Sequence, residues 1–485
     1  MSPWLLLGFV AAYFIILLVV AWYTGRNSSN ESFFIGNRNS NWMLVAFGMI
    51  GTSLSGVTFV SVPGGVAKES FAYFQITLGY LIGYLVIAYV LLPLYYRLNL
   101  TSIYNYLSGR LGFTSYKTGA SFFILSRTLG ATARLYLVVN ILQAAILDKF
   151  NVPFWLTTII ILAMILLYTY EGGVKTIVWT DTLQTTCMLA GLVICVIYIL
   201  NSMDMSLGTA IQTMSDKGYS KVLFTNPDSK LFFVKQIIAG AFITVTMTGM
   251  DQEMMQKNIS VKTLKDSQKN MVTLSIILLG VILLFLFLGG LLYIYGLQNG
   301  VTATGDKLFP TVALEHMPHF IGIIFIIALI SALFPSADGA ITALTSSFCI
   351  DIIGLQRRTD LDDVTKKKWR QRVHLVVAAI FFVFVMIFHW INSSSMIGVI
   401  LKVAAYTYGP LLGLFTFGIL TKRQVNNSFV PIICIVSPIL CFFIDKFQKE
   451  IFGGFEIGLE LLVINGIFTF LGLLLVSKKQ IPAIV

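Results

Sequence analysis

The chain has 485 residues, of which 57% are apolar and only 11% are charged, and its mean hydropathy is +0.84. Such a composition belongs in a lipid bilayer, because a soluble protein of this size needs a far more polar surface. All five cysteines lie inside apolar runs, which excludes a disulfide scaffold and a structural zinc site. The net charge of +11 is interpreted as the basic bias of cytoplasmic loops, and no nucleic-acid partner is expected.

Apolar runs long enough to cross a membrane recur along the whole chain. The first has no basic residue before it and no small-residue cleavage site, so we expect a retained helix and no signal peptide. The runs predict an all-α integral membrane protein with about thirteen transmembrane helices and no separate soluble domain. They cover residues 4–24, 43–63, 74–96, 120–147, 152–170, 177–200, 231–250, 271–296, 318–347, 373–391, 395–420, 428–446 and 457–477.

An odd number of spans places the two termini on opposite sides of the membrane. Most of the 33 lysines and arginines lie in alternate connecting segments, starting with the segment after the first run. Because cytoplasmic loops carry such an excess, the N-terminus is predicted outside and the C-terminus inside. The expected location is the cytoplasmic membrane of the cell, where membrane lipid surrounds the helices.

The predicted spans contain few charged residues, and five of these are singled out: Arg127, Arg134, Asp181, Asp338 and Lys402. A charge near the bilayer centre is costly, so each of the five is a candidate functional residue. The alternative for each is an internal ion pair that fixes helix packing. The functional interpretation is favoured for Asp181 and Asp338, because both lie among hydroxyl residues.

Two runs combine small and hydroxyl residues with helix-breaking chemistry. Residues 48–58 favour an unwound stretch, and Pro335 is expected to break the ninth run and leave a helix carbonyl unpaired. Freed carbonyls beside serine hydroxyls suit a small hard cation. A packing seam of small residues is the alternative, but two such clusters together with two acidic residues favour a cation site.

Catalytic motifs are absent from the sequence, because no HExxH, GxSxG or P-loop pattern occurs and the four histidines lack partners at ligand spacing. We therefore expect a protein that is not an enzyme and has no organic cofactor. A channel would need a continuous polar stripe in place of isolated breaks. Without a nucleotide-binding domain, transport would depend on an ion gradient.

The run at 172–184, GGVKTIVWTDTLQ, resembles the GG…WTDxxQ signature of the sodium/solute symporter family. Residues 249–257 resemble the family's cytoplasmic segment after the seventh helix, and residues 345–351 resemble the end of its eighth core helix. The resemblance covers about residues 4–477. It implies a LeuT-like core of two inverted five-helix repeats, 43–200 and 231–420, with one helix before and two after. The broken helices would be those at 43–63 and 231–250.

The resemblance also implies a principal sodium site. In the family this site is built from carbonyls of core helix 1 and from carbonyls and hydroxyls of core helix 8. By position the ligands here are Gly51, Leu54, Ala332, Pro335 and Ser336. Because Pro335 stands where the family usually has a hydroxyl, one side-chain ligand is missing. Sodium is the only metal ion implied.

Some members of the family hold a second sodium between the aspartate of WTD and hydroxyls one turn further along core helix 8. Asp181 matches that aspartate, while the hydroxyl positions carry Asp338 and Gly339. We expect Asp181 and Asp338 to face each other as a second cation or proton site, since two unpaired carboxylates would otherwise repel. The sodium stoichiometry stays open.

The substrate cavity is placed by the same resemblance. Positions that line it in sugar-transporting relatives carry mostly short hydroxyl and apolar groups, which argues against a galactose-like site. They are Ser53, Val57, Thr58, Thr77, Tyr80, Thr244, Met247, Leu278 and Lys402. Lys402 brings a cation to the cavity, and Arg134 is a candidate second contact through its bidentate fork.

The resemblance therefore implies a symporter that couples sodium entry to uptake of a small organic solute by alternating access. An anionic solute, such as a monocarboxylate, a sugar acid or a sialic-acid-like compound, would neutralise Lys402. A neutral sugar or polyol is the alternative, if Lys402 is neutral or paired. The sequence does not decide the oligomeric state, and it is compatible with a monomer.

Overall fold

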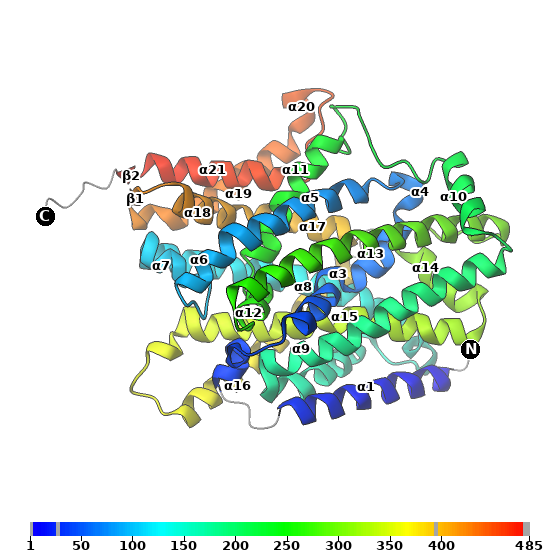
Figure 1. Ribbon diagram of the computed structural model, residues 1–485, viewed down its shortest axis with the longest axis horizontal. Helices are drawn as coiled ribbons and strands as arrows, with labels where there is room; N and C mark the ends of the chain where they lie inside the picture. The colour runs from blue at the N-terminus through cyan, green and yellow to red at the C-terminus, as the bar shows by residue number, and fades with distance from the viewer. Residues whose placement is uncertain (1–2, 26–29, 392–395, 479–485) are drawn as a thin grey trace, which may run out of the picture.

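The computed structural model describes residues 3–25, 30–391 and 396–478. Long helices run along one axis and form an elongated bundle (Figure 1). In the described residues, the strands are β1 (Gln424–Val425) and β2 (Ser477–Lys478), which form a short antiparallel ladder. Helices dominate because a bilayer offers no water to the backbone, so its polar groups must be paired inside each segment.

Apolar helices occupy every predicted run. They are α1 (Pro3–Gly25), α3 (Trp42–Gly64), α5 (Tyr73–Val86) with the π-helix η2 (Ile87–Leu91) and α6 (Leu92–Arg97), α8 (Phe113–Ala145), α9 (Phe154–Ser202), α11 (Phe233–Thr244) with the π-helix η4 (Val245–Gly249), α13 (Leu264–Gln298), α15 (His319–Ser347), α16 (Asp363–Ile391), α17 (Met396–Thr407), α18 (Gly409–Leu420), α19 (Val430–Lys446) and α21 (Leu461–Leu475).

Short helices connect the long ones. They are α2 (Asn30–Ile35), η1 (Gly36–Arg38), α4 (Val66–Glu69), α7 (Asn105–Arg110), η3 (Leu147–Phe150), α10 (Leu207–Asp216), α12 (Gln252–Ile259), η5 (Gly305–Lys307), α14 (Leu308–Thr311), η6 (Val312–His316), η7 (Phe348–Ile353), η8 (Leu355–Arg357), η9 (Asn427–Phe429) and α20 (Gln448–Phe452).

The predicted all-helical membrane architecture is confirmed. Among the described helices, nine are long and apolar enough to cross a membrane, or eleven if each of two bent pairs is one span. Two shorter apolar helices, Phe154–Tyr170 and Leu461–Leu475, occupy the remaining predicted runs. That all thirteen segments cross the bilayer stays a prediction.

The implied break in 43–63 is present, whereas the break implied for 231–250 lies at the end of that run, between Gly249 and Gln252. The backbone of α3 is non-helical at Ser55, where φ is 35° and ψ is 163°. The pair Phe233–Gly249 and Gln252–Ile259 is bent by 67°. A further break at Gly173, with φ of 56°, separates the fifth and sixth predicted runs within α9.

The expected break in the ninth run is wrong. Helix α15 continues from His319 to Ser347 through Pro335. A proline removes one backbone donor, and in a membrane protein the surrounding helices can hold the rest of such a helix in place. From Ala328 to Ser347 every residue of α15 is buried.

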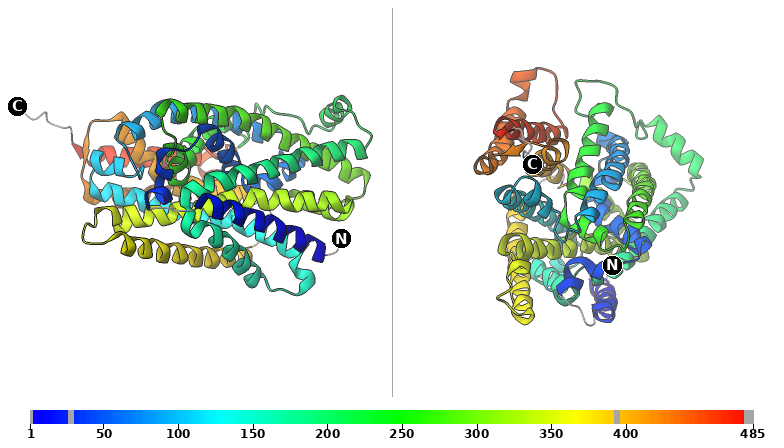
Figure 2. Two further views of the ribbon diagram at one scale, coloured as in Figure 1. Left: turned by 60° about the horizontal axis from the view of Figure 1, so that its bottom comes forward. Right: turned by 60° about the vertical axis from the view of Figure 1, so that its left-hand side comes forward.

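Helices α3 and α15 lie in the middle of the bundle, packed against each other and against α8 and α9. Helices α19 and α21 lie on one side of the bundle, while α1 and α16 lie on the opposite side (Figure 2). The broken stretch of α3 is therefore enclosed by other helices, which is where irregular backbone is tolerated at membrane depth.

Helices α5 and α11 touch through two glycines. A Cβ added to Gly79 would lie 2.1 Å from the Ile237 carbonyl oxygen, and one added to Gly240 would lie 2.2 Å from the Ile76 carbonyl oxygen. Small residues at such contacts let helix backbones approach closely in membranes.

We therefore expect Gly79→Ala to lower the melting temperature of the purified protein, because overpacking of this kind costs about 1–3 kcal/mol. Gly280→Ala in α13 is the matched control, since a Cβ there meets nothing within 4 Å. It should be neutral or slightly stabilising, because alanine favours helix over glycine. Equal melting temperatures for Gly79→Ala and the wild type would contradict the close contact.

Candidate functional site

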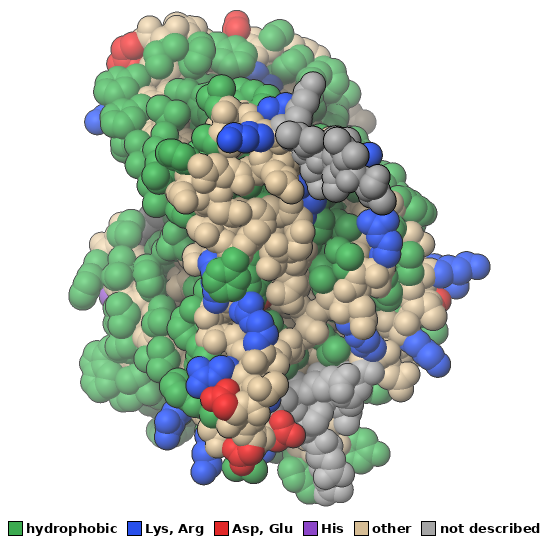
Figure 3. Space-filling view, turned by 90° about the vertical axis from the view of Figure 1, so that its left-hand side faces the viewer, with side chains coloured by type: hydrophobic (Ala, Val, Ile, Leu, Met, Phe, Trp, Pro, Cys, Tyr) green, Lys and Arg blue, Asp and Glu red, His purple; other side chains and the backbone are tan. Residues whose placement is uncertain are grey.

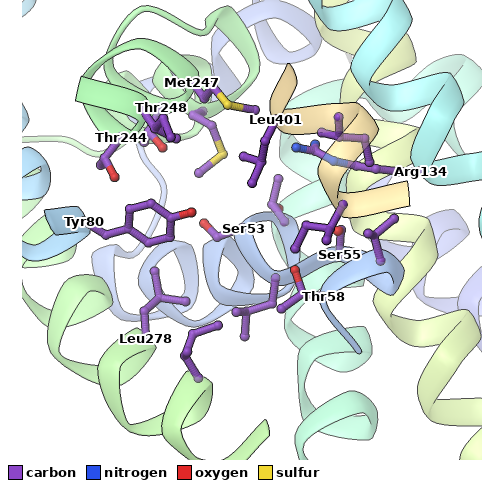
Figure 4. A pocket seen from close by; sticks show the side chains of 18 of the residues that line it. Ser53, Ser55, Thr58, Tyr80, Arg134, Thr244, Met247, Thr248, Leu278 and Leu401 are labelled. Atoms are coloured by element: carbon purple, nitrogen blue, oxygen red, sulfur yellow. The ribbon is translucent and has the colours of Figure 1, made fainter. Parts of the chain in front are cut away.

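A cavity of about 100 Å³ lies at the break in α3, where side chains from α3, α5, α8, α11, α13 and α17 converge (Figure 4). Its polar lining is Thr52, Ser53, Ser55, Thr58, Tyr73, Tyr80, Tyr84, Arg127, Arg134, Thr244 and Thr248. Its apolar lining is Leu54, Val57, Ile243, Met247, Met254, Leu278, Ile282, Ile397, Ile400 and Leu401. The mixture of hydroxyl, aromatic and aliphatic groups suits a small solute with polar substituents.

A second cavity, of about 460 Å³, lies at the end of α3 that bears Gly64 and α4. It shares Tyr73 and Ile397 with the first cavity. The Tyr73 hydroxyl lies 3.3 Å from the Tyr80 hydroxyl. Tyr73 and Ile397 thus lie between the inner cavity and the second cavity beside α4.

Most of the predicted cavity positions do line this cavity. They are Ser53, Val57, Thr58, Tyr80, Arg134, Thr244, Met247 and Leu278. Thr77 is not among the lining residues, contrary to expectation. Its buried hydroxyl donates to the Tyr73 carbonyl oxygen one turn earlier in α5, at 3.1 Å, so it is used within its own helix.

The prediction that Lys402 brings a cation to the cavity is wrong. The Lys402 Nζ lies 2.7 Å from Asp445 Oδ2 on α19, and the lysine side chain is 61% exposed. The residue before it, Leu401, lines the cavity. Successive residues of a helix point about 100° apart, so a shift of one position turns Lys402 towards α19.

Two arginines of α8 line the cavity and differ in their surroundings. The Arg127 guanidinium is ion-paired with Glu253, and its Nε lies 3.9 Å from Asp251 Oδ2. Among the residues that the structure describes, Arg134 has neither a hydrogen bond nor an ion pair with a protein group. Figure 4 shows the Arg134 guanidinium pointing into the cavity. Its positive charge is available to a bound anion.

The segment after the bend, α12, is buried along its whole length. Asp251 caps its N-terminus, because Asp251 Oδ1 accepts from the backbone amides of Glu253 at 2.9 Å and Met254 at 3.2 Å. The Tyr408 hydroxyl donates to Asp251 Oδ2 at 2.9 Å. Sequence analysis placed this polar segment in a cytoplasmic loop; the structure instead shows a helix buried among its neighbours, and its cytoplasmic side stays a prediction.

Lys257 is the most consequential residue that the sequence analysis missed. Its Nζ lies 2.7 Å from Asp181 Oδ2, 2.7 Å from Thr52 Oγ1 and 3.4 Å from Glu253 Oε1. Two sequence signals could have identified it: Asp251 at an N-cap position, and the spacing of four residues between Glu253 and Lys257. The charges on α12 therefore connect Arg127 of α8 with Asp181 of α9.

The predicted sodium ligands lie where α3 crosses α15. The residues Gly51, Leu54, Ala332, Pro335 and Ser336 are all buried. A Cβ added to Gly51 would lie 3.4 Å from Pro335 Cγ, which shows how closely the two helices approach. The Gly51 amide donates to Thr185 Oγ1 at 3.2 Å, and the Ser336 hydroxyl donates to the Leu333 carbonyl oxygen at 2.9 Å.

Asp181 and Asp338 have different surroundings, although both are fully buried. The expectation that both carboxylates are unpaired is wrong for Asp181, which is ion-paired with Lys257. Asp338 Oδ2 accepts from the Tyr168 hydroxyl at 2.7 Å, and its Oδ1 accepts from the Gly339 amide at 2.5 Å. No ion pair of Asp338 occurs in the described parts of the chain.

Known proteins resemble this chain over most of its length. The sequence model of the sodium:solute symporter family matches residues 33–428. A sodium/sialic acid symporter of Proteus mirabilis is 24% identical over 90% of this chain and 88% of its own. Sodium-coupled monocarboxylate transporter 1 of Xenopus laevis is 26% identical over 84% of this chain and 65% of its own.

The fold also matches a solved structure. That structure is a substrate-bound, outward-open state of a Na+-coupled sialic acid symporter. It superimposes with a TM-score of 0.83, covers 98% of this chain and 99% of its own, and is 20% identical in sequence. At this identity the match establishes a shared fold.

The pairing of Arg127 with Glu253 gives a test of the buried charges. Removing one partner of a buried pair leaves the other uncompensated, which costs about 3–5 kcal/mol. We expect Arg127→Met and Glu253→Gln each to lower the melting temperature of the purified protein. The double variant should lose less unfolding free energy than the two single variants lose together, and the difference should be about 0.5–3 kcal/mol. Additive decreases would mean that the two side chains do not interact.

Proposed function

Because the chain belongs to the sodium:solute symporter family and has its LeuT-like fold, we propose that it imports a small anionic organic solute together with sodium. As a family member it is a multi-pass membrane transporter with sodium as its coupling ion. The proposed solutes are monocarboxylates and sugar acids, including sialic-acid-like compounds. Alternating access would expose the cavity first to the outside and then to the cytoplasm.

The unpaired guanidinium of Arg134 is the observation that carries the anionic assignment. A guanidinium presents two parallel N–H donors to a carboxylate, and such bonds are stronger than those between neutral groups. A carboxylate bound there would also neutralise a charge held within the membrane. The two relatives named above are described as transporters of sialic acid and of monocarboxylates, which are all carboxylates.

Hydroxyl groups would select the rest of the solute. Ser53, Thr58, Tyr80 and Thr244 line the cavity and can each donate or accept a hydrogen bond. A sugar acid would use both these groups and Arg134. A neutral sugar or polyol would use the hydroxyls but leave the arginine charge without a partner, so the cavity favours the acid.

We place the coupling sodium between α3 and α15, at Gly51, Leu54, Ala332, Pro335 and Ser336. The break at Ser55 interrupts α3 next to this contact, and interrupted helices free backbone carbonyls for sodium. The resemblance implied a second cation or proton site at Asp181 and Asp338. We propose Asp338 alone for this site, because Lys257 already neutralises Asp181.

For orientation we propose that the N-terminus is outside and the C-terminus is in the cytoplasm. Lysine and arginine side chains gather on the end of the bundle that bears the C-terminal strand β2 (Figure 3). Such an excess marks the cytoplasmic side. The repeats 43–200 and 231–420 would form the moving core, and a single chain would suffice for transport.

Exchange of Arg134 tests the proposed function directly. Arg134→Gln should lower the ratio of maximal uptake rate to half-saturating carboxylate concentration by about tenfold or more, because a charge-assisted contact is lost. Uptake would be driven by sodium and measured in proteoliposomes. Lys402→Gln is the matched control and should retain uptake, since Lys402 lies outside the cavity lining. Suitable probes are lactate, glucuronate and N-acetylneuraminate. Wild-type uptake by Arg134→Gln would reject its role in binding the anion.

A serine exchange tests the sodium site. Ser336→Ala should raise the half-saturating sodium concentration roughly 5- to 30-fold, since one oxygen worth about 1–2 kcal/mol is lost. Ser346→Ala is the control. Ser346 lies beyond the proposed site on the same helix, α15, and its hydroxyl donates to the Thr342 carbonyl oxygen one turn earlier. If both variants show the sodium dependence of the wild type, Ser336 is not a ligand.

A further inference from the structure

Lys257 holds its charge in the middle of an oxygen cluster contributed by three helices. Asp181 comes from α9, Thr52 from the broken helix α3, and Glu253 from α12 itself. The side chains of Lys257, Asp181 and Glu253 are at most 3% exposed. An ammonium group has three N–H donors, and each finds one acceptor in this cluster.

The same oxygen atoms would suit a metal cation. Carboxylate and hydroxyl oxygens are the ligands that hard cations prefer, and membrane transporters hold sodium at interrupted helices. Glu253 is already paired with Arg127, and the buried Asp181 carboxylate requires a positive charge of its own beside it. In this chain the ammonium group that supplies this charge is attached covalently, and it is held 2.7 Å from Asp181.

We propose that Lys257 is a built-in cation that closes the carboxylate site at Asp181 to sodium. Sodium could enter only by displacing an ammonium group whose three donors are satisfied. The displaced group would remain buried without acceptors, which is strongly unfavourable. The inference rests on the proposed sodium coupling and refines its stoichiometry: no coupling ion binds at Asp181.

Removal of the lysine charge should therefore create a sodium site. Lys257→Met keeps much of the side-chain length but leaves Asp181 and Thr52 without the ammonium group, while Glu253 keeps its ion pair with Arg127. The number of sodium ions bound per protein, measured by equilibrium binding of 22Na+ to the purified transporter, should rise by one relative to the wild type. Lys262→Met is the matched control, because Lys262 is exposed beyond the end of α12, and its count should stay unchanged.

An unchanged sodium count in folded Lys257→Met would overturn the proposal. A second variant covers the case in which Lys257→Met does not fold. Lys257→Met/Asp181→Asn removes both charges of the pair, so neither partner is left unpaired. It should bind as many sodium ions as the wild type, whereas the loss of one ion would mean that Asp181 normally binds sodium.

The wild type separates this inference from the proposed function. Saturable 22Na+ binding and sodium-dependent uptake by the wild type support the symporter assignment, whatever the variants do. If the wild type shows neither, the proposed function fails. If the wild type binds sodium and the folded Lys257→Met variant gains no site, only the built-in cation is rejected.

Discussion

A charge buried in a bilayer has to meet an opposite charge, and the interior of this protein is organised around that requirement. The short helix α12 carries Asp251, Glu253 and Lys257 into the bundle, where they meet Arg127 and Asp181. The bend that makes this possible frees backbone carbonyls. Tyr95 and Tyr104 satisfy two of them, because their hydroxyls donate to the carbonyl oxygens of Gly249 and Met250, each at 2.8 Å. Ion pairs and hydrogen bonds to freed backbone carbonyls thus both hold α12 and the bend before it in place.

Arg134 differs from these paired charges. Arg127 and Arg134 lie two turns apart on α8, yet only Arg127 finds acids among the residues that the structure describes. The two arginines therefore have separate roles. Arg127 holds α12 against α8, whereas Arg134 presents its charge to the cavity. The same contrast separates Asp181, which is paired with Lys257, from Asp338, whose oxygens accept from a hydroxyl and an amide.

The amino-acid sequence predicts the parts of this account that depend on composition. Apolar runs located the long helices, and the cluster around Ser55 located the broken one. Sequence could not show which face of a helix a charge occupies, so Lys402 was placed in the cavity in place of Leu401. It also misplaced Lys257, because a segment as polar as α12 has the hydropathy of a loop. Only its tertiary contacts reveal that it is buried. The break predicted at Pro335 was also wrong. Packing around α15 overrides the local helix-breaking tendency of proline, so the helix continues.

The proposed function depends on Arg134, whose unpaired guanidinium would make this cavity selective for anions beside the proposed sodium site. Ligand binding to the folded state raises the melting temperature by mass action, so thermal stabilisation of the wild-type protein reports binding without a transport assay. The most direct measurement compares glucuronate with glucuronamide, each in sodium and in potassium at equal ionic strength. The account predicts stabilisation by the acid in sodium alone and little effect of the amide. Equal stabilisation by the acid and the amide in sodium would contradict it.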